Sequence, residues 1–175
     1  SGYPYIINID TANRTNPVDG TIVMSNLCSE ILQVQQPSLL NDKQEYEVLG
    51  TDISCNLGST NIPNLMQSPD FGKSVETMVR ALTYVTDHSS IDAVPTVKNG
   101  NDLAHTIGLG GMGLHTMFAT NQMHYGSPES IEFTDIYFML LNYYTLAASN
   151  KIAKERGEAF VNFNKSSYYT GEYFD

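Results

Sequence analysis

The chain has 175 residues, of which 41% are hydrophobic and 16% are charged, and its formal net charge is -10. This length is that of one domain with a buried core, and the composition is that of a soluble globular protein. The acidic balance excludes a sequence-independent nucleic-acid binder, which needs a basic face. No apolar run approaches the roughly 20 residues that a membrane span requires, and no signal peptide pattern opens the chain. Two cysteines do not make a disulfide framework, so we expect a reducing, cytoplasmic compartment.

The first part of the chain predicts extended structure. An apolar, β-prone run over 3–9 predicts a strand, and turn residues over 13–20 end it. An extended segment is predicted over 21–31, a polar surface loop over 37–50, and a second short strand over 51–57.

The second part predicts helices. Cap residues at 68–70 and apolar residues at helical spacing predict a helix that ends near His88, followed by a loop over 95–101. A short apolar piece over 104–109 leads into a helix over 112–119. A serine cap and an N1 proline predict a long helix over 128–156, with Gly157 as its stop.

The middle of this long helix, residues 136–146, is apolar on nearly every face. Such a helix is buried on several sides, but the chain supplies few elements to surround it. The chain also starts at Ser1 without a methionine and ends at Asp175 without a polar tail. Together these features predict a piece of a longer protein.

Three chemically active side chains, Asn26, Cys28 and Glu30, alternate within five residues. In an extended segment they would point to one side, whereas in a helix Cys28 would lie nearly opposite the other two. We therefore expect a strand or an extended loop here. A cysteine can form a thiyl radical, a nearby carboxylate can act as general base, and an amide can orient a diol without adding charge. A buried, unreactive thiol is the alternative.

The amino-acid sequence of this motif and of its flanks resembles that of one protein family. Asn26–Ile31 reads Asn-Leu-Cys-Ser-Glu-Ile, which resembles the active-site finger loop of ribonucleotide reductase catalytic (alpha) subunits. Stretches 1–6, 52–59 and 107–115 resemble the aerobic class Ib branch, and the likeness continues to 171–174. The order of these separate motifs makes the resemblance specific.

The resemblance implies an α/β fold, namely part of the ten-stranded α/β barrel of reductases with its finger loop, formed by 1–175 as a single partial domain. It implies that Cys28 is the thiyl that takes the ribose 3′-hydrogen and that Glu30 takes the 3′-hydroxyl proton. Asn26 would hold the ribose hydroxyls, and Leu27 and Ser29 would complete the substrate-binding stretch. Cys55 would be half of a redox-active disulfide whose partner cysteine is absent from this chain. Without the family, Cys55 reads equally well as a buried strand thiol.

The resemblance also implies the partners. The full enzyme would reduce ribonucleoside diphosphates with a radical delivered by a small subunit that holds a dimetal (manganese or iron) centre, and with electrons from a glutaredoxin-like protein. This chain would itself bind no cofactor or metal, nucleotide effectors would bind outside it, and the missing N- and C-terminal parts of the subunit would be needed. We expect no turnover from the chain alone.

Two alternatives belong to other classes. One is a non-catalytic or split-gene assembly fragment that acts only with its missing flanking segments. The other is a nucleotide-binding oxidoreductase, because Gly108–Gly113 matches G-x-G-x-x-G, although the acidic residue expected after it, Glu132, falls inside the next helix. Close packing between a strand and a helix accounts better for these glycines. The spacing of the four histidines does not favour a zinc site, and we expect Tyr143 and Tyr144 to serve in packing.

Overall fold

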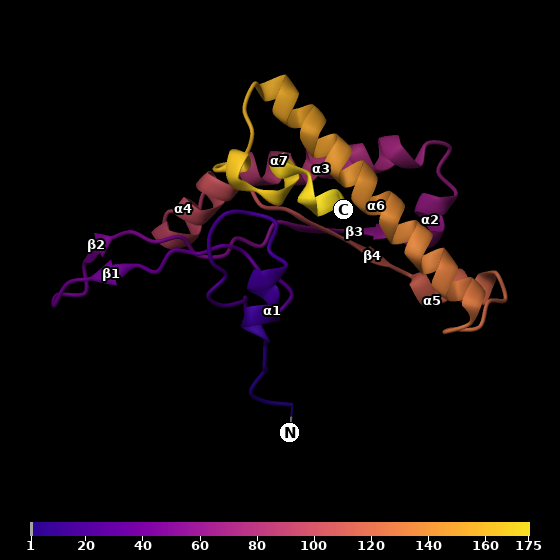
Figure 1. Ribbon diagram of the computed structural model, residues 1–175, viewed down its shortest axis with the longest axis horizontal. Helices are drawn as coiled ribbons and strands as arrows, with labels where there is room; N and C mark the ends of the chain where they lie inside the picture. The colour runs from indigo at the N-terminus through magenta and orange to yellow at the C-terminus, as the bar shows by residue number, and fades with distance from the viewer. Residues whose placement is uncertain (1) are drawn as a thin grey trace. The chain divides into compact units, whose positions relative to one another are not determined.

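A computed structural model describes residues 2–175, so Ser1, the first residue of the resembling stretch 1–6, lies outside the described residues. The chain forms two compact units, which we call unit 1 and unit 2. Of the described residues, unit 1 comprises 2–55, 86–106 and 159–175, and unit 2 comprises 56–85 and 107–158. The chain mixes helices and short strands, as an α/β protein does (Figure 1).

Unit 2 is built on a pair of parallel strands. Strand β3 (Leu57–Asn61) pairs residue for residue with β4 (Gly108–Met112), from Leu57 opposite Gly108 to Asn61 opposite Met112. The helices of this unit are α2 (Ile62–Met66), most of α3 (Phe71–His88), α5 (Leu114–Thr120) and α6 (Pro128–Arg156). Their buried side chains form one core, which consists of Ile62, Leu65, Val75, Val79, Tyr137, Leu141, Ala148 and Ile152.

The two long helices begin and end as their local signals predict. The Ser127 hydroxyl caps α6 by accepting a hydrogen bond from the Ser130 N–H at 3.3 Å, and Gly157 ends the helix with φ 74°. Helix α3 follows its predicted cap residues and ends at His88. Both helices are specified by residues at their own ends, which is why their bounds are predictable from the sequence.

An ionic cluster joins α3 and α6 within unit 2. Glu76 accepts hydrogen bonds from Lys151 and Arg80, each at 2.8 Å, and Arg80 also donates to both carboxylate oxygens of Glu155 at 2.7 and 2.8 Å. The hydrogen bonds from Lys151 and Arg80 lower the pKa of Glu76 from 4.5 to about 2. The cluster therefore keeps Glu76 ionised well into the acid range.

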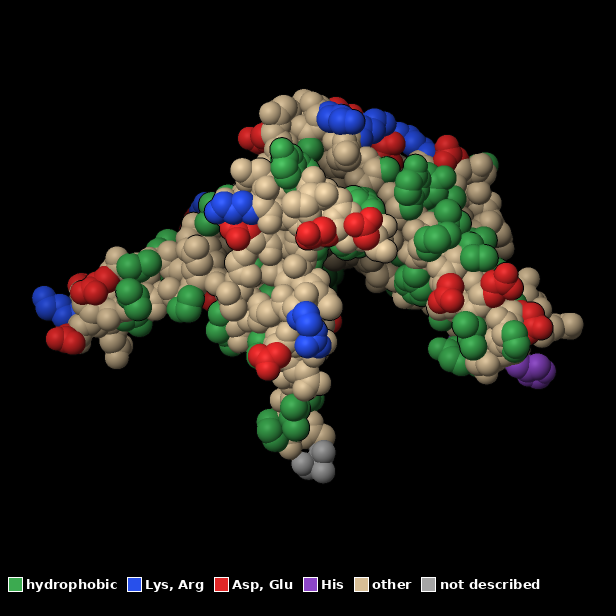
Figure 2. Space-filling view, in the orientation of Figure 1, with side chains coloured by type: hydrophobic (Ala, Val, Ile, Leu, Met, Phe, Trp, Pro, Cys, Tyr) green, Lys and Arg blue, Asp and Glu red, His purple; other side chains and the backbone are tan. Residues whose placement is uncertain are grey.

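The outward side of α6 is apolar and exposed, which agrees with the expectation that this chain supplies too few elements to surround the helix. Hydrophobic side chains are exposed along this helix, as Figure 2 shows. The exposed residues of α6 include Ile131, Ile136, Met139 and Tyr143. Tyr144, next to Tyr143, instead packs against Phe71 with ring centroids 5.7 Å apart. Within this chain, α6 is thus buried along one stripe only.

Unit 1 contains short elements and long irregular segments. Its elements are α1 (Ile9–Arg14), the hairpin strands β1 (Leu39–Leu40) and β2 (Tyr46–Val48), α4 (Pro95–Ala104), α7 (Ser167–Thr170) and the 3-10 turns η1 (Phe163–Lys165) and η2 (Glu172–Phe174). The hairpin β1–β2 is visible in Figure 1 within the stretch predicted as a plain loop.

The structure contradicts the predictions for three further stretches. Residues 3–8 form no strand and lead into α1, because a β-prone run needs a neighbouring strand for its hydrogen bonds and none of the described residues pairs with it. Residues 95–104 form a helix, not a loop, since Pro95 occupies the first turn, where a proline is tolerated. The strand predicted over 51–57 starts only at Leu57, where β4 supplies a partner, so Cys55 lies in irregular chain just before β3.

Candidate active site

The Asn26–Glu30 motif forms a tight turn. The Ser29 N–H donates to the Asn26 carbonyl at 3.0 Å, and Ser29 adopts the left-handed conformation with φ 68°. The Asn26 side-chain oxygen accepts the Ile31 N–H at 3.0 Å, which closes the turn a second time. The expected extended geometry is therefore wrong for Leu27–Ser29, although the motif is not helical. Asn26 bends the chain because it supplies two acceptors to the backbone that follows it.

The chain segment that leads into this turn is held by hydrogen bonds to side-chain amides, and not by pairing with a neighbouring strand. The Gln35 side-chain oxygen accepts the N–H groups of Val23 and Met24, both at 3.0 Å, and the Gln35 side chain is buried. Asn13 brackets Ile22 by donating to its carbonyl at 2.9 Å and accepting its N–H at 2.8 Å. The two arms of the turn are thus tied to buried or half-buried amides.

The turn presents its reactive groups to solvent. Cys28 and Glu30 are exposed, Asn26 and Ser29 are half-buried, and Leu27 is 89% exposed at the tip. Both Cys28 and Cys55 are free thiols. The position is accessible to a substrate and to reagents, as a catalytic thiol must be.

Cys55 lies close to all three members of the motif. Partial burial of its sulfur raises its pKa above the usual 9.0, and the neighbouring charges of Glu30 and Cys28 raise the pKa further. A hydrogen bond from the Asn26 side chain acts in the opposite direction. The structure thus brings Asn26, Cys28, Glu30 and Cys55 together in unit 1, where Cys55 is exposed and its raised pKa disfavours the thiolate.

Sequence reasoning did not identify every residue near the thiols. Tyr5 has a raised pKa, caused first by a hydrogen bond with Tyr3, then by burial and by the charge of Cys28. The rings of Tyr3 and Tyr5 stack with centroids 5.3 Å apart. No pattern in the sequence points to Tyr5, because the contact depends on how the irregular segment 2–8 is placed in unit 1.

Packing accounts for the glycines of 108–113. A Cβ on Gly111 would meet the Ile62 side chain at 3.2 Å, and a Cβ on Gly113, which has φ 83°, would meet Pro63 at 3.2 Å. The helix that follows, α5, has seven residues, which is short for the helix N-terminus of a dinucleotide site. The expectation that these glycines serve packing of strand and helix agrees with these contacts.

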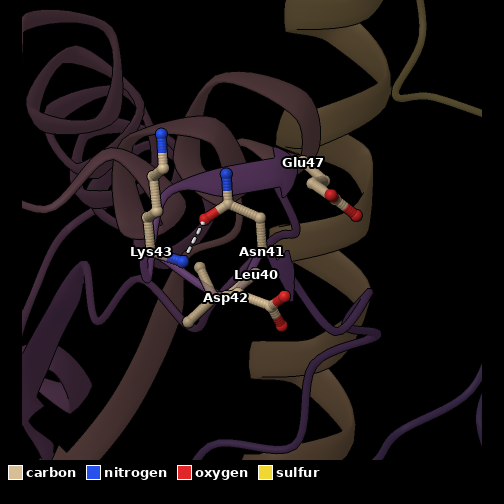
Figure 3. A pocket seen from close by; sticks show the side chains of 5 residues that line it. All are labelled: Leu40, Asn41, Asp42, Lys43 and Glu47. Atoms are coloured by element: carbon tan, nitrogen blue, oxygen red, sulfur yellow. Dashed lines mark hydrogen bonds between the residues drawn. The ribbon is translucent and has the colours of Figure 1, made fainter.

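Three further features of the described residues concern metals, membranes and surface hollows. Among residues 2–175, no group of three or more His, Cys, Asp or Glu side chains is arranged to hold a metal ion. None of the described helices is long and apolar enough to cross a membrane. Figure 3 shows a surface hollow at the β1–β2 hairpin lined by Leu40, Asn41, Asp42, Lys43 and Glu47. There the Lys43 N–H donates to the Asn41 side chain at 2.9 Å, and none of the lining residues belongs to the thiol site.

The fold of the chain is similar to that of a solved protein, and its sequence matches a family model. The chain superposes on the alpha subunit of the class Id ribonucleotide reductase of Actinobacillus ureae with a TM-score of 0.72 and 24% identity, over 91% of this chain and 30% of that one. The barrel-domain model of ribonucleotide reductases matches residues 1–175. The chain therefore belongs to the ribonucleotide reductase barrel-domain family.

Close relatives carry the same family name. The chain is 45% identical to a Mycoplasma pneumoniae protein and 43% identical to a Bacillus subtilis protein, both named ribonucleoside-diphosphate reductase subunit alpha. Both alignments cover 100% of this chain, but only 24% and 25% of those relatives. The chain thus spans about a quarter of the length of the curated relatives it matches.

Proposed function

We propose that this chain carries the thiyl-radical site of a ribonucleoside-diphosphate reductase of the class Ib type, with residues 1–175 as one part of the catalytic barrel. The observation that carries the proposal is the convergence of Cys28, Glu30, Asn26 and Cys55 at one exposed turn. The names of the relatives supply the substrate class, a ribonucleoside diphosphate.

Each residue has a defined chemical task in this proposal. The Cys28 thiyl takes the hydrogen atom from C3′ of the ribose, which leaves a thiol and a carbon radical. Glu30 accepts the proton of the 3′-hydroxyl, and Asn26 orients the ribose hydroxyls through its amide. The 2′-hydroxyl then leaves as water. A general base beside a hydrogen-abstracting sulfur is the minimum that this step needs.

Cys55 supplies reducing equivalents in the same proposal. The thiol form of an ordinary cysteine already predominates at neutral pH, and the raised pKa of Cys55 disfavours the thiolate further. A thiol can deliver a proton and a reducing equivalent, whereas a thiolate lacks the proton. Cys55 would be oxidised to a disulfide with a cysteine on another part of the subunit. A glutaredoxin-like protein would reduce that disulfide, and a small subunit with a manganese or iron dimetal centre would deliver the radical.

We also propose that turnover requires the remaining parts of the subunit. The exposed apolar side of α6 supports this, since a hydrophobic stripe of that kind is normally covered. Analytical ultracentrifugation with and without the flanking polypeptides would detect the association. We expect no deoxynucleotide from the chain alone, even with substrate, reductant and small subunit present, and any product from that mixture would contradict this requirement.

The test of the function uses the chain complemented with those polypeptides and the small subunit, and a substrate tritiated at C3′. Cys28→Ser should abolish both tritium release and deoxynucleotide formation, because oxygen replaces the sulfur that abstracts hydrogen. Cys55→Ser is the matched control, since it removes the other thiol of the cluster and should spare tritium release while blocking repeated turnover. Tritium release that survives Cys28→Ser would refute the proposal.

A further inference from the structure

One side chain links the two segments that carry the cysteines. The Gln33 amide donates to the Ser54 carbonyl at 3.1 Å, and its oxygen accepts the Ser54 N–H, also at 3.1 Å. Ser54 is 6% exposed and Gln33 is half-buried, so this two-way contact is partly shielded from water. Gln33 follows Glu30 by three residues, and Ser54 immediately precedes Cys55. The contact therefore lies between the reactive turn and the second thiol.

The Gln33 contact continues an antiparallel pairing that starts further along the same segments. Gln36 and Thr51 form an isolated antiparallel bridge, in which the Thr51 N–H donates to the Gln36 carbonyl at 2.9 Å. Gln33 lies three residues before Gln36, and Ser54 lies three residues after Thr51. The Gln33–Ser54 contact thus lies in the same register, three positions further along, but a side chain has taken the place of a backbone partner.

This replacement changes the spacing of the two segments. Directly paired strands lie about 4.8 Å apart, and a glutamine side chain placed between two backbones holds them farther apart. It still satisfies both buried polar groups of Ser54, which would be costly to leave unpaired. The segments therefore keep a fixed register at this point, with the Gln33 side chain as the spacer between them.

We propose that Gln33 is a positioning residue for the site: its amide, bonded in both directions to the Ser54 backbone, sets the separation of Cys55 from the Cys28–Glu30 turn. The inference rests on the proposed function for the roles of the two thiols. The placement of Cys55 beside Glu30 and Cys28 is a property of this chain, and it can be measured without turnover.

The reactivity of the Cys55 thiol reports its surroundings. In the native arrangement, burial and the charges of Glu30 and Cys28 raise the Cys55 pKa. Cys55 is already exposed, so if Gln33 holds it in that arrangement, removal of the amide should move Cys55 away from the charges of Glu30 and Cys28 and lower its pKa. Each unit by which a pKa falls increases the thiolate fraction about tenfold at a pH well below it.

The experiment measures alkylation of the 175-residue chain by iodoacetamide as a function of pH. Trypsin cleaves after Arg14, Lys43 and Lys73, so Cys28 and Cys55 fall in separate peptides and are quantified separately by mass spectrometry. Gln33→Met keeps the length of the side chain and removes its amide. We expect this variant to shift the midpoint of the Cys55 profile downward and to raise the alkylation rate of Cys55 at pH 7.5.

Gln36→Met is the matched control in the same segment. Its side chain is exposed, and the hydrogen bonds described for this residue come from its backbone, so the Cys55 profile should stay at the wild-type position. Near-ultraviolet circular dichroism of each variant establishes that the fold is retained. Identical Cys55 profiles in Gln33→Met and the wild type would overturn the positioning role.

This outcome is independent of the proposed function. The alkylation profile contains no radical chemistry, so a failed turnover assay leaves the positioning result intact. Conversely, a normal profile in Gln33→Met with loss of tritium release in Cys28→Ser would retain the function and discard the role of Gln33. The two proposals can therefore fail separately.

Discussion

The hydrogen-bonded pair Thr60–Tyr137 gives a sharp prediction for the core of unit 2. Tyr137 is 1% exposed and Thr60 is 6% exposed, and their hydroxyl oxygens lie 3.0 Å apart. Thr60 also donates to the Gly110 carbonyl at 3.0 Å. A hydroxyl has one proton, and Thr60 donates that proton to the Gly110 carbonyl. Tyr137 must therefore be the donor in its hydrogen bond with Thr60.

Because Tyr137 donates and Thr60 accepts, Tyr137→Phe and Thr60→Val should lower the free energy of unfolding by different amounts. Tyr137→Phe removes a donor and leaves Thr60 bonded to Gly110, so it should cost about 1 kcal/mol. Thr60→Val removes the acceptor and strands a buried phenol proton, which costs roughly 1–3 kcal/mol beyond the lost bond to Gly110. In the double variant no phenol proton is left unpaired, so its destabilisation should be smaller than the sum of the two single values.

Urea unfolding followed by circular dichroism at 222 nm measures these differences. Each single variant, the double variant and the wild type form a double-mutant cycle, and the denaturant slope shows whether the unfolded state has changed. The reasoning would be refuted if Tyr137→Phe destabilised the chain more than Thr60→Val, because that order reverses the assigned donor.

Three further predictions concern stability and the glycine loop. Ser127→Ala should lower the free energy of unfolding by about 1 kcal/mol in urea titrations, because α6 loses its cap, whereas Ser149→Ala on the exposed side of the same helix should be neutral or stabilising. Glu76→Gln should destabilise the chain at neutral pH and matter less as the pH falls from about 4.5 toward about 2, since a carboxylate with a lowered pKa contributes stability only while it is ionised. Thermal melts at several pH values would show this convergence with the wild type, and Glu132→Gln on the exposed side of α6 is the control; a constant difference across that range would contradict it. Titration with NAD should give negligible binding to both the wild type and Gly110→Val, and binding that only the wild type shows would revive a nucleotide site at Gly108–Gly113.

The parts of the fold that the sequence predicts are those with local signals. Helix α6 begins at Pro128 after a serine cap and ends before Gly157, and α3 follows its own cap and apolar spacing, so neither boundary depends on distant contacts. The strands depend on partners instead. Residues 3–8 have the composition of a strand but belong to no β-ladder of the described residues. Strand β4 is glycine-rich, yet it pairs with β3 through its whole length.

The candidate site divides in the same way. Residue types and order identified Asn26, Cys28, Glu30 and Cys55, but the turn geometry depends on the Asn26 side chain and on Ser29 in a left-handed conformation. The role of Gln33 requires that Ser54 lie beside it, and no spacing rule pairs residues that are 21 positions apart in irregular chain. The periodicity of hydrophobic residues in a sequence does not predict contacts between a side-chain amide and a distant part of the backbone.

The two compact units alternate along the polypeptide, and this affects how the protein is made. Unit 2 needs Thr60 and Gly110, which are 50 residues apart, before its two strands can join. Closing a flexible loop of that length costs about 3.5 kcal/mol of chain entropy. Unit 1 is completed only when 159–175 emerges from the ribosome. Neither half can mature early during translation, and neither can be excised by cutting the gene at a single point.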